Sequence, residues 1–138
     1  MSINGIHHLG LTVADVETSA KWYEAVLGFE RSGGFESPGG ERRKVFLRHD
    51  GLGARIGLTE HATADRTPFD ETRIGLDHLA FQVDTQADLR AWERRLTEHD
   101  LQFTPIAPAN SIPGAFVLVL RDPDNIQLEL FYDPTQLN

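Results

Sequence analysis

The sequence predicts an α+β fold of two tandem β-α-β-β-β modules, whose eight strands form one curved half-barrel sheet with the helices outside. Three observations lead to this class: an internal repeat of about 70 residues, the same order of hydrophobic patterns in both halves, and a histidine at the equivalent strand position of each half. The 138 residues suit one domain with one core. Within it we place module one at about 3–61, a linker at about 62–74 and module two at about 75–133.

The composition excludes several classes of protein. With a formal net charge of −8, the chain lacks the basic face that binds nucleic-acid phosphates, so no nucleic-acid partner is expected. No apolar run reaches the roughly 18 residues that span a bilayer, and the first residues do not read as a signal peptide, so no membrane partner is expected. The chain has no cysteine, which excludes thiolate ligands and is in keeping with a cytoplasmic location.

The repeat is clearest at the first strand of each half. Residues 6–13 align with residues 76–83, which places His78 over His8 at an offset of 70 positions. Both segments alternate apolar and polar residues, the pattern of a half-buried strand.

The rest of each half continues the repeat. Trp92 follows Trp22 at the same offset of 70, inside a helix-like stretch in both halves. Further on, residues 47–51 align with residues 119–123 at an offset of 72, which implies a small loop insertion in the second half.

Each half is therefore expected to contain a strand, a helix and three further strands. The first helix is marked by Val16, Ala20, Tyr23 and Leu27 at roughly helical spacing, with acidic and hydroxyl residues within 14–19 that can cap its start and Gly28 as its C-cap. The second is marked by apolar residues at helical spacing over about 89–99. The expected strands are 3–13, 29–35, 43–48 and 54–60, followed by 76–84, 102–106, 115–121 and 126–132.

His8 and His78 are the first candidate functional residues. A lone histidine in a strand is usually a surface or hydrogen-bonded core residue, but two at equivalent positions of a repeat are harder to explain in that way. If the modules pack about a pseudo-twofold axis, equivalent residues approach each other near that axis. Two imidazoles facing one cleft are good nitrogen ligands for a first-row metal ion.

Glu129 is the third candidate, in an otherwise apolar strand. Either Glu129 or its neighbours Leu128 and Leu130 face inward, and an ionised carboxylate on an inward face is costly unless it is paired or metal-bound. In a sheet curled around a metal cleft, the two leucines would face the helix while Glu129 and His8 line the cleft. By the same alternation His7 points to the helix side or an edge, and we expect no role for it.

The sequence resembles the vicinal-oxygen-chelate superfamily, which includes glyoxalase I, extradiol dioxygenases, methylmalonyl-CoA epimerase and the fosfomycin and bleomycin resistance proteins. The resemblance covers nearly the whole chain and is specific for the superfamily, but it does not identify the activity. The matching segments are Ile6-x-His8-Leu9-Gly10-Leu11-x-Val13-x-Asp15, Trp22-Tyr23-x-x-Val26-Leu27-Gly28-Phe29, Leu76-Asp77-His78-Leu79-Ala80-Phe81-x-Val83 and Arg121-Asp122-Pro123-Asp124-Asn125-Ile126-x-Leu128-Glu129-Leu130.

The resemblance implies a ligand position on the first and last strand of each module, which here are His8, Gly57, His78 and Glu129. Glycine has no side chain to offer, so Gly57 counts against a glyoxalase or an epimerase, which normally use a side chain there. Two histidines and one glutamate resemble the ligand set of the extradiol dioxygenases, with Fe(II) favoured and Mn, Ni, Co or Zn possible.

Other residues depart from the dioxygenase pattern. Ring-cleaving members also use a histidine and a tyrosine near the metal. The strand of residues 115–120 holds no tyrosine, and Tyr132 has the opposite parity to Glu129. His61 has the parity of Gly57 and is the candidate catalytic histidine, with a structural or surface role as the alternative.

The expected function is a metal-dependent enzyme, most similar to a dioxygenase, that binds a small-molecule substrate through vicinal oxygens. Phe46, Phe116 and Phe131 could form apolar walls around that substrate. A glyoxalase-type lyase or epimerase and a non-catalytic drug- or metabolite-binding resistance protein remain the alternatives. Relatives often pair modules between chains, and a homodimer is expected.

Overall fold

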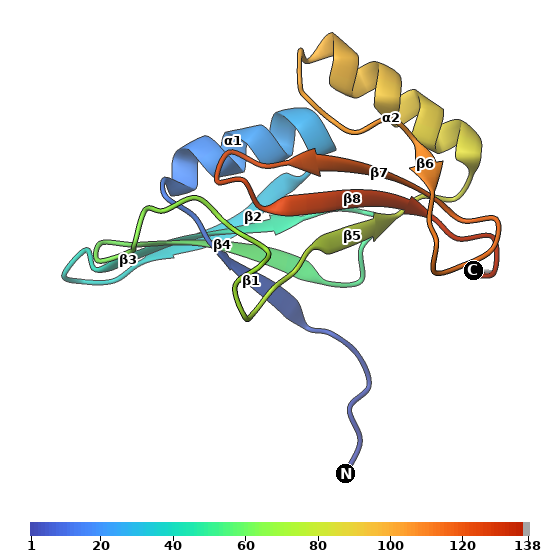
Figure 1. The fold of residues 1–138 in the computed structure, drawn as a ribbon. Coiled ribbons are helices and arrows are strands. Elements are labelled where there is room, and N and C mark those ends of the chain that lie inside the picture. Colours follow the sequence, from blue (N-terminus) through green and yellow to red (C-terminus); the bar gives the residue numbers. More distant parts are fainter. Residues whose placement is uncertain (137–138) are drawn as a thin grey trace. The chain divides into compact units, whose positions relative to one another are not determined.

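The computed structural model describes residues 1–136, which contain eight strands and two helices. The chain separates into two compact units, residues 1–67 and residues from 68 onward. Each unit holds one helix and one four-stranded sheet, in the order of elements that the sequence predicts (Figure 1). The α+β class and its two tandem β-α-β-β-β modules are confirmed. Neither helix in this part of the chain is long and apolar enough to cross a membrane.

The first unit is a mixed sheet with one helix against it (Figure 1). Its strands are arranged in the order β1-β4-β3-β2, with β1 parallel to β4 and the other pairs antiparallel. The helix packs on β3 and β4, and its residue Tyr23 is completely buried. The elements are β1 (His8–Thr12), α1 (Val16–Leu27), β2 (Glu30–Glu36), β3 (Arg42–Arg48) and β4 (Arg55–His61).

Helix α1 begins and ends where the sequence predicts. The Asp15 carboxylate accepts a hydrogen bond from the Thr18 amide at 2.7 Å, which satisfies one of the free amides of the first turn. Gly28 ends the helix in the left-handed region, at φ 76°, and its amide donates to the carbonyl of Glu24. These two caps fix how the chain leaves β1 and enters β2.

The second unit repeats this plan, with strand order β5-β8-β7-β6. Strands β5 and β8 are parallel, and the other pairs are antiparallel. The helix packs on β7 and β8 through the buried residues Leu89 and Leu96. The elements are β5 (Leu79–Gln82), α2 (Gln86–Glu98), β6 (Ala107–Pro108), β7 (Phe116–Arg121) and β8 (Gln127–Tyr132).

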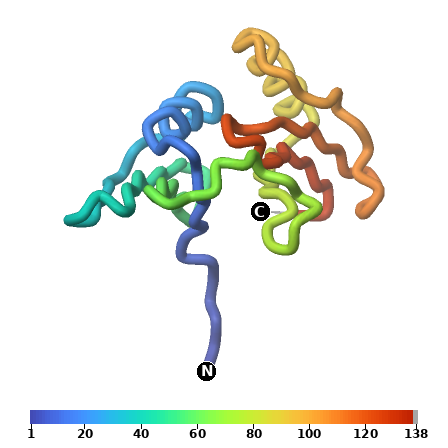
Figure 2. The backbone as a smooth tube through the Cα atoms, turned by 60° about the vertical axis from the view of Figure 1, so that its left-hand side comes forward, coloured from blue at the N-terminus to red at the C-terminus, as the bar shows by residue number. Residues whose placement is uncertain are grey.

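The first strand of each unit is shorter than predicted. Strand β1 begins at His8, whose partner Arg55 is the first residue of β4, so residues before His8 have no strand beside them in their own sheet. Residues 1–7 are instead exposed and run away from the strands of their unit (Figure 2). In the second unit, the predicted strand 76–84 is reduced to β5, Leu79–Gln82.

The predicted strand 102–106 is wrong. Only Phe103 forms an isolated bridge, to Leu120, and the regular pairing is limited to the two residues of β6. Pro105 and Pro108 cannot donate a backbone hydrogen bond, so this segment cannot form a continuous ladder along β7.

The outer strand β2 differs from β6 in length and exposure. All seven residues of β2 are exposed, and its pairing with β3 shifts by one residue between Arg31 and Gly33, as in a β-bulge. Its charged residues include Glu30, Arg31 and Glu36, and Arg31 bonds to Glu17 of α1 at 2.9 Å. The first unit therefore ends in a long, charged edge strand.

The strand registers correct one part of the predicted repeat. Phe46 pairs with Gly57 in the first unit, and Val119 pairs with Glu129 in the second. Phe46 is therefore equivalent to Val119, at an offset of 73 positions, and the predicted alignment of Leu47 with Val119 is wrong by one residue. The cause is the connection between the paired residues, which is one residue longer in the first unit.

The segment before β5 is hydrogen-bonded to the end of β7 and to the turn between β7 and β8. Both terminal nitrogens of Arg121 bond to the Glu71 carboxylate, at 2.9 and 2.7 Å. The backbone amide of Phe69 donates to the carbonyl of Asp124, and the Asn125 side chain donates back to the Phe69 carbonyl. Much of the Arg121–Asn125 motif therefore has a structural role.

The Glu71 carboxylate makes this attachment sensitive to acid. Its hydrogen bonds from Arg121 lower the pKa of Glu71 from 4.5 to about 2, so the pair stabilises the fold fully above about pH 4.5. As the pH falls from there to about 2, Glu71 binds a proton and this stabilisation is lost.

We predict that Glu71→Gln lowers the free energy of unfolding at neutral pH and that the difference from the wild type shrinks between pH 4.5 and about 2. Urea unfolding over that pH range measures the difference. Glu98→Gln, on the exposed end of α2, is the control and should show no such trend. A difference for Glu71→Gln that stays constant across this range would contradict the assignment.

Candidate functional site

His78 and Glu129 come together in the second unit. His78 lies immediately before β5, and Glu129 is in the middle of β8, paired with Ala80. On β8 the neighbours Leu128 and Leu130 are buried against the helix side, at 0% and 2% exposure, so Glu129 projects from the opposite face. The Nε2 atom of His78 is 3.7 Å from Oε2 of Glu129.

The separation of these two side chains fits a shared metal ion. Donor atoms about 2.1 Å from one ion, at angles of about 90–110°, are roughly 3.0–3.4 Å apart. The 3.7 Å between Nε2 of His78 and Oε2 of Glu129 is a few tenths of an ångström longer. A small side-chain movement would therefore let both atoms bind one ion.

Asp77 holds the other ring nitrogen of His78. Its Oδ1 atom is 2.6 Å from Nδ1 of His78, so the imidazole lies between two carboxylates. Sequence reasoning did not single out Asp77, although its position directly before a repeat-equivalent histidine could have indicated it.

His8 lies in the other unit, at the start of β1, and its side chain is exposed. Its Nδ1 atom is 2.8 Å from Nδ1 of His7, and the expectation that His7 has no functional role remains a prediction. The described residues contain no group of three histidine, aspartate or glutamate side chains placed to hold an ion. The convergence of His8 with His78 and Glu129 remains a prediction.

The registers place Gly57 at the position equivalent to Glu129, as the sequence alignment predicts. Gly57 pairs with Gly10 in the first unit, just as Glu129 pairs with Ala80 in the second. A Cβ atom added at Gly57 would be 3.4 Å from Cε1 of Phe46. The space for a side chain at position 57 is therefore bounded by the Phe46 ring, where the second unit has the smaller Val119 beside Glu129.

His61, the candidate catalytic residue, is the last residue of β4 and is partly buried. It has the parity of Gly57, as expected, but follows it by four positions, which is roughly 13 Å along a strand. An imidazole that far along β4 would not touch an ion bound beside position 57. Its catalytic role remains a prediction.

The two other histidines have local partners. His49 accepts a hydrogen bond from the Gly51 amide at 3.1 Å, and its ring packs on Phe29. His99 caps the end of α2, where its backbone amide donates to Arg95. Neither needs a ligand to explain its position.

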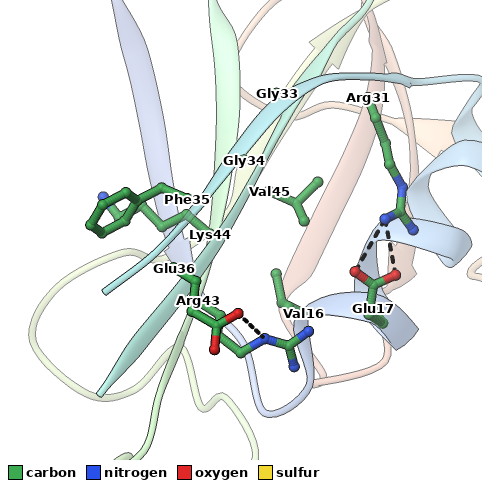
Figure 3. Close-up of a pocket in the computed structure, with 10 residues that line it drawn as sticks. All are labelled: Val16, Glu17, Arg31, Gly33, Gly34, Phe35, Glu36, Arg43, Lys44 and Val45. Carbon is green, nitrogen blue, oxygen red and sulfur yellow. Dashed lines mark hydrogen bonds and ion pairs between the residues drawn. The ribbon is translucent and has the colours of Figure 1, made fainter. Parts of the chain in front are cut away.

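A separate hollow of about 500 Å³ opens in the first unit, beside the start of α1 and strands β2 and β3. Four of its charged residues form two ion pairs, Arg31 with Glu17 at 2.9 Å and Arg43 with Glu36 at 3.9 Å (Figure 3). None of the predicted site residues lines it. We therefore assign it no function.

Comparisons with known proteins agree with the fold. The sequence profile of the Glyoxalase/Bleomycin resistance protein/Dioxygenase superfamily matches residues 5–130. The chain belongs to this superfamily. It is 35% identical to the glyoxylase/bleomycin resistance protein/dioxygenase domain from Frankia sp. EAN1pec, whose crystal structure superimposes with a TM-score of 0.83 over 95% of this chain and 98% of that one. The predicted resemblance to vicinal-oxygen-chelate proteins is confirmed.

More distant members of the superfamily share the fold. A glyoxalase family protein from Enterococcus faecalis is 24% identical, with a TM-score of 0.77 over 95% of this chain and 99% of that one. The fosfomycin resistance protein FosX from Listeria monocytogenes is 17% identical, with a TM-score of 0.71 over 97% and 96%. A search of curated protein sequences found no match.

The first unit has Phe46 and Gly57 where the second unit has Val119 and Glu129, and this difference leads to a testable prediction. Gly57→Glu should destabilise this superfamily member by about 1–3 kcal/mol, because the new side chain must displace the Phe46 ring. In Gly57→Glu with Phe46→Val, urea unfolding should show less destabilisation than the sum of the single changes, by about 1 kcal/mol. Gly57→Ala is the control, since its Cβ makes ordinary contact. Strict additivity would refute the proposed packing.

Proposed function

We propose that this protein is a divalent-metal enzyme that binds a small substrate through two adjacent oxygen atoms. His8, His78 and Glu129 would supply the ligands, with donor atoms about 2.0–2.3 Å from the ion. The observation that carries the proposal is the proximity of His78, directly before β5, to Glu129 on the neighbouring parallel strand β8, at a separation that one ion could bridge. Two imidazoles and one carboxylate suit Fe(II), which we favour, and also Mn, Ni, Co or Zn.

The missing side chain at Gly57 favours oxygen chemistry over isomerisation. Three protein ligands leave two positions for a chelating substrate and a further one for oxygen or water. When bound, the metal would act as a Lewis acid on the substrate oxygens and could organise oxygen beside them. Phe46 beside Gly57, and Phe131 two residues after Glu129 on the same face of β8, would offer apolar walls that exclude water.

A metal-dependent reaction without oxygen is the second candidate. FosX, which shares the fold, has been solved with Mn(II) and sulfate, and a glutamate-to-glutamine mutant of FosX with Mn(II) and 1S,2S-dihydroxypropylphosphonic acid, a compound with two adjacent hydroxyl groups. A lyase or epimerase of the glyoxalase type would need another base in place of a side chain at Gly57. A metal-free binding protein is disfavoured because it would have no use for the paired His78 and Glu129.

Reconstitution with metal separates these candidates. We predict that protein loaded anaerobically with Fe(II) consumes oxygen when screened with catechols and other vicinal-oxygen compounds. Glu129→Ala and His78→Ala should each lower that activity at least about 100-fold, because a lost ligand costs more than the loss of a supporting residue. His99→Ala, at the helix end, is the matched control and should keep the activity. An oxygen electrode and elemental analysis provide the measurements.

The same reconstitution experiment can also favour one of the other candidate functions. Full turnover with Zn²⁺ and no oxygen uptake on any converted substrate would indicate the lyase or epimerase. Retention of metal affinity in both His78→Ala and Glu129→Ala would rule out the proposed ligands altogether.

We also propose that the protein is a homodimer, as related proteins pair modules between chains. Light scattering on the purified protein at micromolar concentration should give about twice the chain mass of 15.4 kDa. A monomer mass under these conditions would refute the dimer without affecting the metal site.

A further inference from the structure

In both units, the residue before the strand histidine occupies its Nδ1 atom. Asp77 is 2.6 Å from Nδ1 of His78, and His7 is 2.8 Å from Nδ1 of His8. These pairs lie at equivalent positions of the repeat, 70 residues apart. A carboxylate only accepts hydrogen bonds, whereas either imidazole of the His7–His8 pair can donate, so only the Asp77–His78 contact assigns Nε2 as the ring nitrogen left for a ligand.

We propose that Asp77 is a positioning residue that holds His78 with its Nε2 atom directed at the metal position beside Glu129. A carboxylate can only accept hydrogen bonds, so a neutral His78 must carry its single proton on Nδ1. Its Nε2 lone pair is then free on the side of Glu129, 3.7 Å away. This inference rests on the metal site proposed above and adds a residue that supports it.

The local backbone explains why neighbouring side chains can meet here. Residues 77 and 78 both precede β5, which begins at Leu79, so the alternation of a strand does not force them to opposite faces. A carboxylate bonded to the second nitrogen of a metal-binding imidazole fixes the orientation of the ring and makes it a stronger ligand. Asp77 has the position and the chemistry for this effect.

A purely structural role for Asp77 would have different consequences. The side chains of Asp77 and His78 are 69% and 41% exposed, and ion pairs this exposed contribute little to stability. Loss of Asp77 should therefore leave the unfolding transition almost unchanged. Its effect should appear in metal affinity instead.

Titration of the full-length, metal-free protein with Co(II) tests the proposal. Asp77→Ala should bind Co(II) 10- to 100-fold more weakly than the wild type, with Asp77→Asn intermediate because its amide oxygen still accepts from Nδ1. Glu98→Ala removes one acid from the same unit and should bind within about twofold of the wild type. Equal affinity of Asp77→Ala and the wild type, with His78→Ala impaired, would overturn the role of Asp77 and leave the metal site standing.

The protonation of His78 gives a second readout that needs no metal. In ¹⁵N spectra of the metal-free protein at about pH 9, where an ordinary imidazole is neutral, His78 should carry its proton on Nδ1. In Asp77→Ala the Nε2-protonated form should gain population. Any other pattern in the wild type would overturn the proposal. If neither the wild type nor any variant binds Co(II), the proposed function fails. The ¹⁵N spectrum then still decides whether Asp77 determines which ring nitrogen of His78 carries the proton.

Discussion

The parallel pairing of β5 with β8 is the constraint on which the candidate site depends. The register of Ala80 with Glu129 sets which residue of β8 lies beside the start of β5, where His78 is found. Because side chains alternate along a strand, a shift of one residue would turn Glu129 toward the helix and bring Leu128 or Leu130 out. The burial of these two leucines on the α2 side of the sheet therefore fixes the Glu129 carboxylate on the opposite face.

The two units share one architecture but differ in the side chains at equivalent positions. They share the order of elements, a helix whose N-terminus is capped by a side chain, and the parallel first and last strands. At the equivalent positions, however, one unit has Gly57 under Phe46 and the other has Glu129 beside Val119. A large ring replaces a carboxylate with little change in the sheet, so the repeat keeps its architecture while only one copy keeps a full histidine–carboxylate pair.

Much of the fold could be predicted from the sequence, because the signals are local. Gly28 ends α1 as predicted, the N-cap Asp15 lies within the stretch 14–19 that the sequence offers for the helix start, and the alternation around Glu129 agrees with the observed faces of β8. Strand ends were less predictable, since a strand ends where its neighbour does: His8 starts β1 because β4 starts opposite it. The contact of Asp77 with His78 was missed for the same reason, as alternation was assumed beyond the paired residues.

The exposed edge formed by β2 has a consequence for how the protein behaves in concentrated solution. The outer edge of this seven-residue strand could recruit a strand from another molecule, whereas the two residues of β6, one of them a proline, offer almost nothing to pair with. In β2 the bulge after Arg31 and the charged Glu30, Arg31 and Glu36 oppose such stacking. Apolar replacements of these residues would therefore favour fibril-like self-association.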